Sequence, residues 1–227
     1  DNLSLILQRY FFLGNYVSQT TYFRLEKQRE PKEWTCYRNT PGARYQAIPE
    51  LRDSLLKEQG YICAYCMRRI PCRDANSTES TRIEHLKCRK LHPDLELDYH
   101  NMVVCCPGAI TDDFHCDKRK EDAEISFDVF SENFIETLSY GSKDGTLKSS
   151  IPQWNDELNE VLHLNNELLK ANRREALRAV QMFLERTPNV ATVRRKLDEW
   201  IQKDGQGKYR PYCGIVIWYL QRWLRRH

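Results

Sequence analysis

The chain has 227 residues, of which 41% are hydrophobic and 30% are charged. A chain of this length and composition buries a core of its own and is too apolar to be disordered as a whole, so we expect a folded protein of one or two domains. The formal net charge of +3 gives no argument for a nucleic-acid partner, so any electrostatic case rests on local basic clusters. These clusters, each of which alone is more typical of a solvated face, are Arg68-Arg69, Arg89-Lys90, Lys118-Arg119-Lys120, Arg173-Arg174, Arg194-Arg195-Lys196 and Arg225-Arg226.

The first segment is an apolar run from Leu3 to Val17, broken by Gln8, Arg9 and Asn15. It lacks a basic leader and a stretch long enough to cross a bilayer, so we expect an amphipathic helix and no membrane partner. The chain has nine cysteines, an odd number, and no secretory signal precedes them. Reduced thiols or metal ligands are therefore expected instead of a disulfide framework, and the expected compartment is the cytoplasm.

A helix is expected within residues 43–60, where Pro49 suits a first helical turn, leucines follow at helical spacing and Gly60 ends the run. From there to about residue 120, cysteines, histidines and prolines alternate with short apolar runs, and residues 81–83 and 102–104 are the expected strands. The expected organisation is an N-terminal helical segment (1–54), a central core (55–125) and a C-terminal helical region (126–227).

The C-terminal region is expected to be helical. Leucines and valines recur at helical spacing through residues 154–186, and Thr187-Pro188 ends the run. Two further helices are expected at about 191–203 and 211–226, the last of which is apolar with a basic end. We favour core packing for its aromatic face, and a groove on a partner protein is the alternative.

The cysteines suggest a metal site. Cys63 and Cys66 stand in the sequence YICAYC, whose C-x2-C spacing lets two thiolates bind one tetrahedral zinc. Cys105 and Cys106 follow an expected strand, in which neighbours point to opposite faces, so only one of them faces the metal. We choose Cys106, together with Cys116, as the second pair. The alternative is that some of these cysteines are simply buried apolar residues.

Between the two cysteine pairs, Glu84 and His85 end an expected strand. A carboxylate offers a hard oxygen ligand to a divalent cation, and an imidazole titrates near neutrality and can deprotonate water. A Glu-His pair alone is weak evidence. Its weight comes from Asn101, which precedes an apolar strand, and from Asp117 and Lys120, which open a helix.

In this order the residues resemble the HNH (His-Me finger) nuclease family, whose core runs C-x2-C, then (D/E)-H, then N with an apolar strand ending in C, then C-(H/N/D)-x2-K. Such ordered submotifs are more specific than any one of them. The matching residues are Cys63, Cys66, Glu84, His85, Asn101, Cys106, Cys116, Asp117 and Lys120.

The resemblance implies an α+β, mainly α fold, in which a zinc-stapled ββα-metal core lies between N- and C-terminal helices. It also implies that Glu84 and Asp117 hold one divalent cation, Mg²⁺ or Mn²⁺. His85 would be the general base, Asn101 would fix the loop that aims the imidazole, and Lys120 would be a further catalytic residue. The zinc on the four cysteines would be structural, because a fully liganded ion leaves no open position for substrate.

The chain departs from the HNH pattern in two places. Asp117 stands where His or Asn is commoner, which leaves His115 as a rival ligand of the catalytic cation. The insert 107–114 widens the spacing between Cys106 and Cys116, and His115 is also an alternative to one of the thiolates.

A narrower resemblance covers roughly residues 24–220. The segments EKQREPKEW, YICAYC, IEHLKCRKLHPDLELDYHNMVVCC and YCGIVIWYL are similar to the PtuB family, the HNH components of Septu anti-phage systems, although Cys88 stands where that family often has proline. The resemblance implies a PtuA-like ATPase of the ABC/SMC type as partner. Because such nucleases also accompany some retrons, a retron reverse transcriptase with its msDNA is a further expected partner.

The favoured function is therefore a metal-dependent endonuclease that acts as the effector of a defence complex. Its main alternative is a non-catalytic zinc module that binds nucleic acid or protein, which would have no use for two carboxylates and a histidine in this order. An ATPase accessory with a degenerate HNH centre ranks lower, because the motif residues are present. The residues do not distinguish DNA, which the family implies, from a structured RNA such as tRNA.

Overall fold

The computed structural model describes residues 23, 25–70, 81–109, 112–186 and 189–227. Within them the fold is α+β and mainly helical, as the sequence predicts, with two small antiparallel sheets. The amphipathic helix expected near residues 3–17 lies outside the described part. The helices are α2 (Lys32–Arg38), α3 (Pro49–Glu58), α4 (Asp117–Lys120), α5 (Glu132–Glu136), α6 (Pro152–Asp156), α7 (Glu167–Arg186), α8 (Val190–Ile201) and α9 (Cys213–Leu224), and the strands are β1 (Arg82–His85), β2 (Met102–Cys105), β3 (Leu138–Tyr140) and β4 (Leu147–Ser149).

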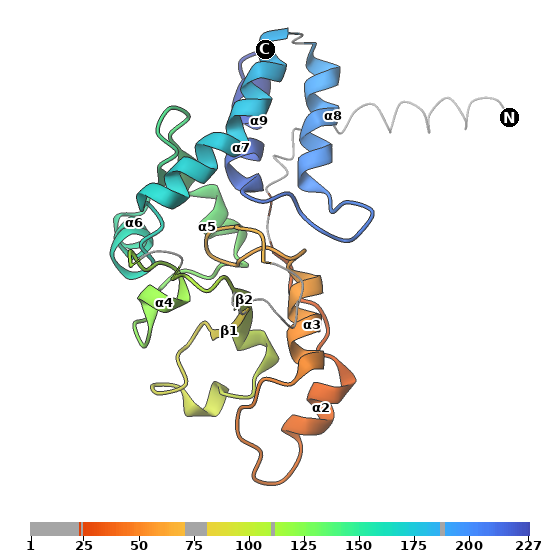
Figure 1. Cartoon of the computed structure of the whole chain (residues 1–227), viewed down its shortest axis with the longest axis vertical. Coiled ribbons are helices and arrows are strands. Elements are labelled where there is room, and N and C mark those ends of the chain that lie inside the picture. The colour runs from red at the N-terminus through yellow and green to blue at the C-terminus, as the bar shows by residue number, and fades with distance from the viewer. Residues whose placement is uncertain (1–22, 24, 71–80, 110–111, 187–188) are drawn as a thin grey trace, which may run out of the picture.

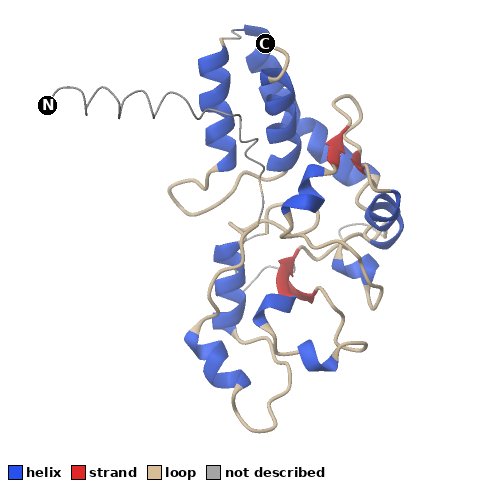
Figure 2. Ribbon diagram, turned by 180° about the vertical axis from the view of Figure 1, so that it is seen from behind, coloured by secondary structure: helices blue, strands red, loops and turns tan. Residues whose placement is uncertain are grey.

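The molecule is elongated (Figures 1 and 2). Helices α2 and α3 gather with the β1–β2 hairpin at one end, whereas α7, α8 and α9 form the other end. The short helices α4, α5 and α6 lie between these groups. None of the described helices combines the length and the apolar character that a bilayer crossing needs.

Helix α3 begins at Pro49, the residue that the sequence marks as its start. The helix does not extend back to residue 43, because a residue before proline is pushed out of the helical region, and Ile48 has the extended angles φ −80° and ψ 152°. Leu51 and Leu55 are completely buried, and α3 packs against β2. The expected boundary between residues 54 and 55 falls inside this helix.

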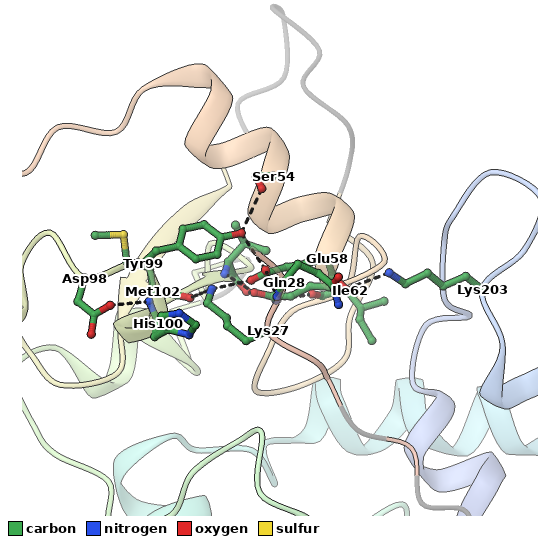
Figure 3. Close-up of polar contacts among 12 residues, drawn as sticks. Lys27, Gln28, Ser54, Glu58, Ile62, Asp98, Tyr99, His100, Met102 and Lys203 are labelled. Atoms are coloured by element: carbon green, nitrogen blue, oxygen red, sulfur yellow. Dashed lines mark hydrogen bonds and ion pairs between the residues drawn. The ribbon is translucent and has the colours of Figure 1, made fainter. Parts of the chain in front are cut away.

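A buried carboxylate at the end of α3 joins distant parts of the chain (Figure 3). The Nζ atom of Lys27 lies 2.6 Å from Oε1 of Glu58 and also donates to the carbonyl of Met102 at 2.7 Å. The Tyr99 hydroxyl donates to Oε2 of Glu58 at 2.8 Å. From the C-terminal region, Lys203 donates to the backbone carbonyl of Glu58 at 3.0 Å. The N-terminal segment, α3, the hairpin and a C-terminal loop therefore meet at one residue.

The β1–β2 hairpin is the framework of the candidate site. The strands predicted near 81–83 and 102–104 are confirmed, and they pair antiparallel with Glu84 opposite Val103 and His85 opposite Met102. Because successive side chains alternate across a strand, Glu84 and His85 leave opposite faces of the hairpin. Two short 3₁₀ helices, Pro93–Leu95 and Tyr99–Asn101, shape the loop between the strands.

The continuous helix expected over residues 154–186 is broken in the structure. Helix α6 passes into a π-helical turn at Glu157–Val161, and α7 begins only at Glu167. At the break, the carbonyl of Leu162 accepts a 2.9 Å hydrogen bond from the backbone N–H of Cys116, which joins this segment to the central core. The two helices expected after it are confirmed as α8 and α9, and α9 buries its apolar side chains in the core.

Candidate functional site

Four buried cysteines form a cluster at the base of the hairpin. Their Sγ atoms, from Cys63, Cys66, Cys106 and Cys116, all lie within 4.8 Å of one another. The Cys63–Cys116 sulfur pair is 3.8 Å apart and the Cys66–Cys106 pair is 3.7 Å apart. Four sulfurs each about 2.3 Å from one tetrahedral zinc ion are separated by about 3.8 Å, so the spacing fits zinc. The residues chosen from the sequence are therefore those that come together.

Local backbone geometry explains why Cys63 and Cys66 face one ion. The backbone N–H of Met67 donates to the carbonyl of Cys63 at 3.0 Å, and the N–H of Cys63 donates to the carbonyl of Arg68 at 2.9 Å. Met67 adopts a positive φ of 60°, which turns the chain back after the second cysteine. These bonds form the tight turn that places two sulfurs on the same side.

The other pair comes together despite the wide spacing between its members. The N–H of His115 donates to the carbonyl of Gly108 at 2.9 Å and closes the insert into a loop. Gly108 has φ +66°, and an added Cβ would meet the carbonyl oxygen of His115, so glycine is required there. Cys105, the alternative to Cys106, ends β2 opposite Arg82 and is buried outside the four-sulfur cluster.

His115 lies against the cysteine cluster. Its Nδ1 atom is 3.1 Å from the sulfur of Cys116 and 3.9 Å from that of Cys106. Burial lowers the pKa of His115, which favours its neutral form. An imidazole N–H at this distance can stabilise a thiolate by hydrogen bonding. His115, the rival ligand of the catalytic cation, thus lies with the cysteines, and the polar contacts of its Nδ1 atom are with their sulfur atoms.

The second part of the candidate site is a pair of facing carboxylates, Glu84 and Asp117. The side chains of Glu84, on β1, and Asp117, at the start of α4, lie close enough to form a hydrogen bond when one of the two carboxyl groups is protonated. Glu84 accepts a 3.1 Å hydrogen bond from the Tyr65 hydroxyl, and its Oε1 lies 2.9 Å from Nζ of Lys120. Arg82 donates to Oδ2 of Asp117 at 2.8 Å. Hydrogen bonds from an arginine and a tyrosine thus hold both carboxylates in place.

Burial and two charged neighbours, Asp117 and Lys120, determine the electrostatics of Glu84. Burial raises the pKa of Glu84 to about 8, the hydrogen bond with Asp117 also raises it, and the charge of Lys120 opposes the rise. Lys120 is fully buried, and its ammonium makes the ion pair with Glu84 without a well-directed hydrogen bond. Glu84 is buried and the Asp117 side chain is 15% exposed, and carboxylate oxygens are the ligands that Mg²⁺ and Mn²⁺ prefer.

His85 lies next to Glu84 but is held from the other face of the hairpin. Its Nε2 atom is 3.0 Å from the backbone carbonyl of Glu96. A carbonyl only accepts hydrogen bonds, so Nε2 carries the proton and Nδ1 is left unprotonated. Burial lowers the pKa of His85 to about 4, against the raising effect of the Glu96 carbonyl. The ring is therefore neutral near pH 7, with one nitrogen able to accept a proton.

Asn101 fixes the loop that holds this histidine. Its Oδ1 accepts from the N–H of Lys87 at 2.8 Å, and its Nδ2 donates to the carbonyls of Lys87 at 3.0 Å and Leu95 at 3.3 Å. Leu95 directly precedes Glu96, so the amide of Asn101 braces the segment that supplies the carbonyl to His85. The role that the sequence resemblance implies for Asn101, fixing the loop that aims the imidazole, stays a prediction.

Three side chains and one backbone carbonyl of the candidate site were not predicted from the sequence. Tyr65 and Arg82 bind the two carboxylates, and the ring of Tyr45 lies 4.5 Å from the His85 ring. Tyr65 stands between the first two cysteines, a position from which its role could have been suspected. The Glu96 carbonyl belongs to the backbone, so no side-chain pattern marks it.

Comparison of the sequence with protein-family models and with curated proteins finds no match.

Proposed function

We propose that the chain is a metal-dependent endonuclease of the HNH (His-Me finger) type that hydrolyses phosphodiester bonds of nucleic acid. One observation carries the proposal. The carboxylate pair of Glu84 and Asp117 stands at the end of β1, where the next residue, His85, is a neutral imidazole whose Nε2 is held by the Glu96 carbonyl. These groups stand on a β-hairpin and a short helix, which supports assignment of the central core as a ββα-metal unit.

In this proposal His85 is the general base. Its Nδ1 atom takes a proton from the water that attacks the phosphorus atom, while the bond to Glu96 fixes the tautomer and the direction of the ring. Asn101 is a positioning residue that acts through the same loop. The low pKa of His85 keeps Nδ1 unprotonated over the physiological range.

Glu84 and Asp117 would hold one Mg²⁺ or Mn²⁺ ion, and the donor set fits, since both groups offer hard carboxylate oxygens in contact. When bound, the ion supplies Lewis-acid stabilisation of the phosphate and of the departing oxygen. Arg82 and Tyr65 keep the two carboxylates oriented. Lys120 holds a positive charge against Glu84, where it balances the negative charge of the site.

The four cysteines would hold a structural zinc ion. A closed set of four thiolates leaves no place for substrate, so this ion would serve folding. It would join the turn at Cys63 to the start of α4 at Cys116, and thereby hold Asp117 near Glu84.

The resemblance of residues 24–220 to the PtuB family supports a biological setting for the same activity. We propose a cytoplasmic effector of an anti-phage complex, with a PtuA-like ABC/SMC-type ATPase as partner and a retron reverse transcriptase with its msDNA as a further partner. An ATPase partner is physically sensible, because a nuclease in its own cell must be restrained.

The direct test is cleavage of plasmid DNA and of total tRNA in Mg²⁺ or Mn²⁺, by the purified chain alone and with the ATPase. Cleavage that needs the metal and disappears in His85→Ala supports the proposal and identifies the substrate class. Absence of cleavage under every metal and partner condition contradicts it and favours the non-catalytic zinc module. Zinc content and thermal unfolding of each variant show that the fold is retained.

A further inference from the structure

The proposed general base is covered in the structure. His85 is 5% exposed, although a base must meet a water molecule and the substrate phosphate. The Tyr45 ring packs against the imidazole edge to face, with ring centroids 4.5 Å apart and an interplanar angle of 84°. Arg89 lies over the same tyrosine ring, 4.6 Å from its centroid. Tyr45 is thus a lid on His85, and access depends on whether it moves.

Tyr45 belongs to the loop between α2 and α3, residues 39–48, which we call the strap (Figure 1). Besides the Arg89–Tyr45 contact, an ion pair of 2.8 Å between Nε of Arg44 and Oε1 of Glu96 links the strap to the hairpin loop. The Arg44 side chain is 81% exposed, so this pair is weak by the standard of surface salt bridges. The Tyr37 hydroxyl steadies the strap from α2 by donating to the Arg44 carbonyl at 2.7 Å.

The rest of the strap is loosely held. Among the residues that the structure describes, no backbone hydrogen bond joins residues 44–47 to the hairpin or to its loop. Tyr37 and residues 40–46 border an open surface hollow of about 470 Å³, while Tyr45 and Ile48 pack against the hydrophobic core. A segment that lacks backbone hydrogen bonds to its neighbours opens at lower free energy than a helix or a strand.

We propose that the strap is a gate over His85, which Tyr45 closes and the Arg44–Glu96 ion pair latches. This inference rests on the proposed function, because it assigns the gate to the base of that reaction. Glu96 has two parts in it: its carboxylate holds the latch, and its backbone carbonyl holds Nε2 of His85. Opening the gate therefore uncovers the His85 ring without releasing the bond to Nε2 that orients it.

The gate is tested by the accessibility of His85. Diethyl pyrocarbonate modifies unprotonated imidazole nitrogens, and peptide mass spectrometry gives the rate at each histidine, with exposed His100 as the internal reference. In Tyr45→Ala the modification of His85 is expected to accelerate about tenfold, because an aromatic pair contributes up to about 1.5 kcal/mol. In Arg44→Ala, whose exposed side chain makes misfolding no concern, we expect about threefold.

Gln46→Ala changes an exposed residue of the same strap and is the matched control, expected to leave the rate as in the wild type. Faster modification in both Tyr45→Ala and Arg44→Ala supports the gate. A rate at His85 that equals the wild-type rate in both variants, or a wild-type His85 as reactive as His100, overturns it. Cleavage assays on the same samples separate the two proposals: if His85 is uncovered but no form cleaves nucleic acid, the nuclease assignment fails and the gate stands.

Discussion

The hydroxyl of Tyr65 donates a 3.1 Å hydrogen bond to Oε1 of Glu84. Tyr65 stands inside the C-x2-C turn, so the bond links the cysteine cluster to the carboxylate that we propose as a ligand of the catalytic cation. Both side chains are buried, and hydrogen bonds to charged groups in such places contribute more than exposed ones. The zinc turn therefore also orients a catalytic carboxylate, and removing one hydroxyl tests that link.

Tyr65→Phe is expected to slow metal-dependent cleavage about tenfold, because a lost bond to a buried carboxylate is worth about 1–2 kcal/mol. The zinc content should stay at the wild-type value, since no thiolate is changed. Tyr99→Phe is the matched control: it also removes a hydrogen bond from a buried tyrosine to a carboxylate, but at Glu58. Equal cleavage rates in Tyr65→Phe and the wild type would show that this bond does not orient Glu84.

The cysteine cluster predicts different effects for substitutions of two neighbouring residues, Cys105 and Cys106. Cys106→Ser should lower the bound zinc, measured by atomic emission, and abolish cooperative thermal unfolding of the core, because structural zinc sites supply folding energy directly. Cys105→Ser, its neighbour outside the four-sulfur cluster, should retain zinc at the wild-type ratio. The opposite pattern would assign the fourth sulfur to Cys105.

Glu84 predicts a pH dependence of stability in protein that retains zinc but is free of Mg²⁺ and Mn²⁺. Burial raises its pKa to about 8 in the folded state, above the ordinary carboxyl value of 4.5. As pH rises, the Glu84 carboxyl therefore loses its proton in the unfolded state before it does so in the folded state. The free energy of unfolding accordingly falls between about pH 5 and about pH 8 and levels off above that. Relative to Glu84→Gln, the free energy of unfolding of the wild type should decline over this window, as urea titrations measure. A difference between the two that is constant with pH contradicts the prediction.

The buried Lys27–Glu58 ion pair joins the N-terminal segment to α3, and we expect its removal to lower the free energy of unfolding. Both side chains are nearly inaccessible, so removing one partner leaves an unpaired buried charge. Lys27→Met should lower the free energy of unfolding by about 3 kcal/mol, whereas the double variant Lys27→Met with Glu58→Leu should recover part of that loss. Urea unfolding of Lys27→Met, of Glu58→Leu and of the double variant measures the three losses. A double variant at least as unstable as the sum of the single variants would argue against a paired role.

Much of the site could be predicted from the sequence because its chemistry is local. The spacing of Cys63 and Cys66 and the order of Glu84, His85 and Asp117 follow from short motifs, and the structure brings the two cysteines together and places Asp117 against Glu84. The helix expected over 154–186 failed for a different reason. At its break, Leu162 accepts a hydrogen bond from Cys116, which is distant in sequence, and helical periodicity does not record such a contact. Arg173, which the sequence favours as part of a solvated face, is 3% exposed and donates to the carbonyl of Gly145.

Tyr45 and Glu96 show the same limit at the site itself. Tyr45 reaches His85 from a loop that is remote in sequence, and Glu96 acts through its backbone carbonyl. Contacts of this kind depend on how α2, the strap and the hairpin loop pack together. Neither residue type nor spacing encodes them, so they are known only from the folded chain.

The measurement that tests the central claim most directly is the initial rate of metal-dependent nucleic-acid cleavage by His85→Ala, beside His100→Ala as a control for an exposed histidine of the same loop. A general base contributes about 100-fold or more, so His85→Ala should lose at least that factor at unchanged zinc content, and His100→Ala should match the wild type. Cleavage by His85→Ala at the wild-type rate would contradict the account, because the imidazole held by Glu96 would then have no part in the reaction.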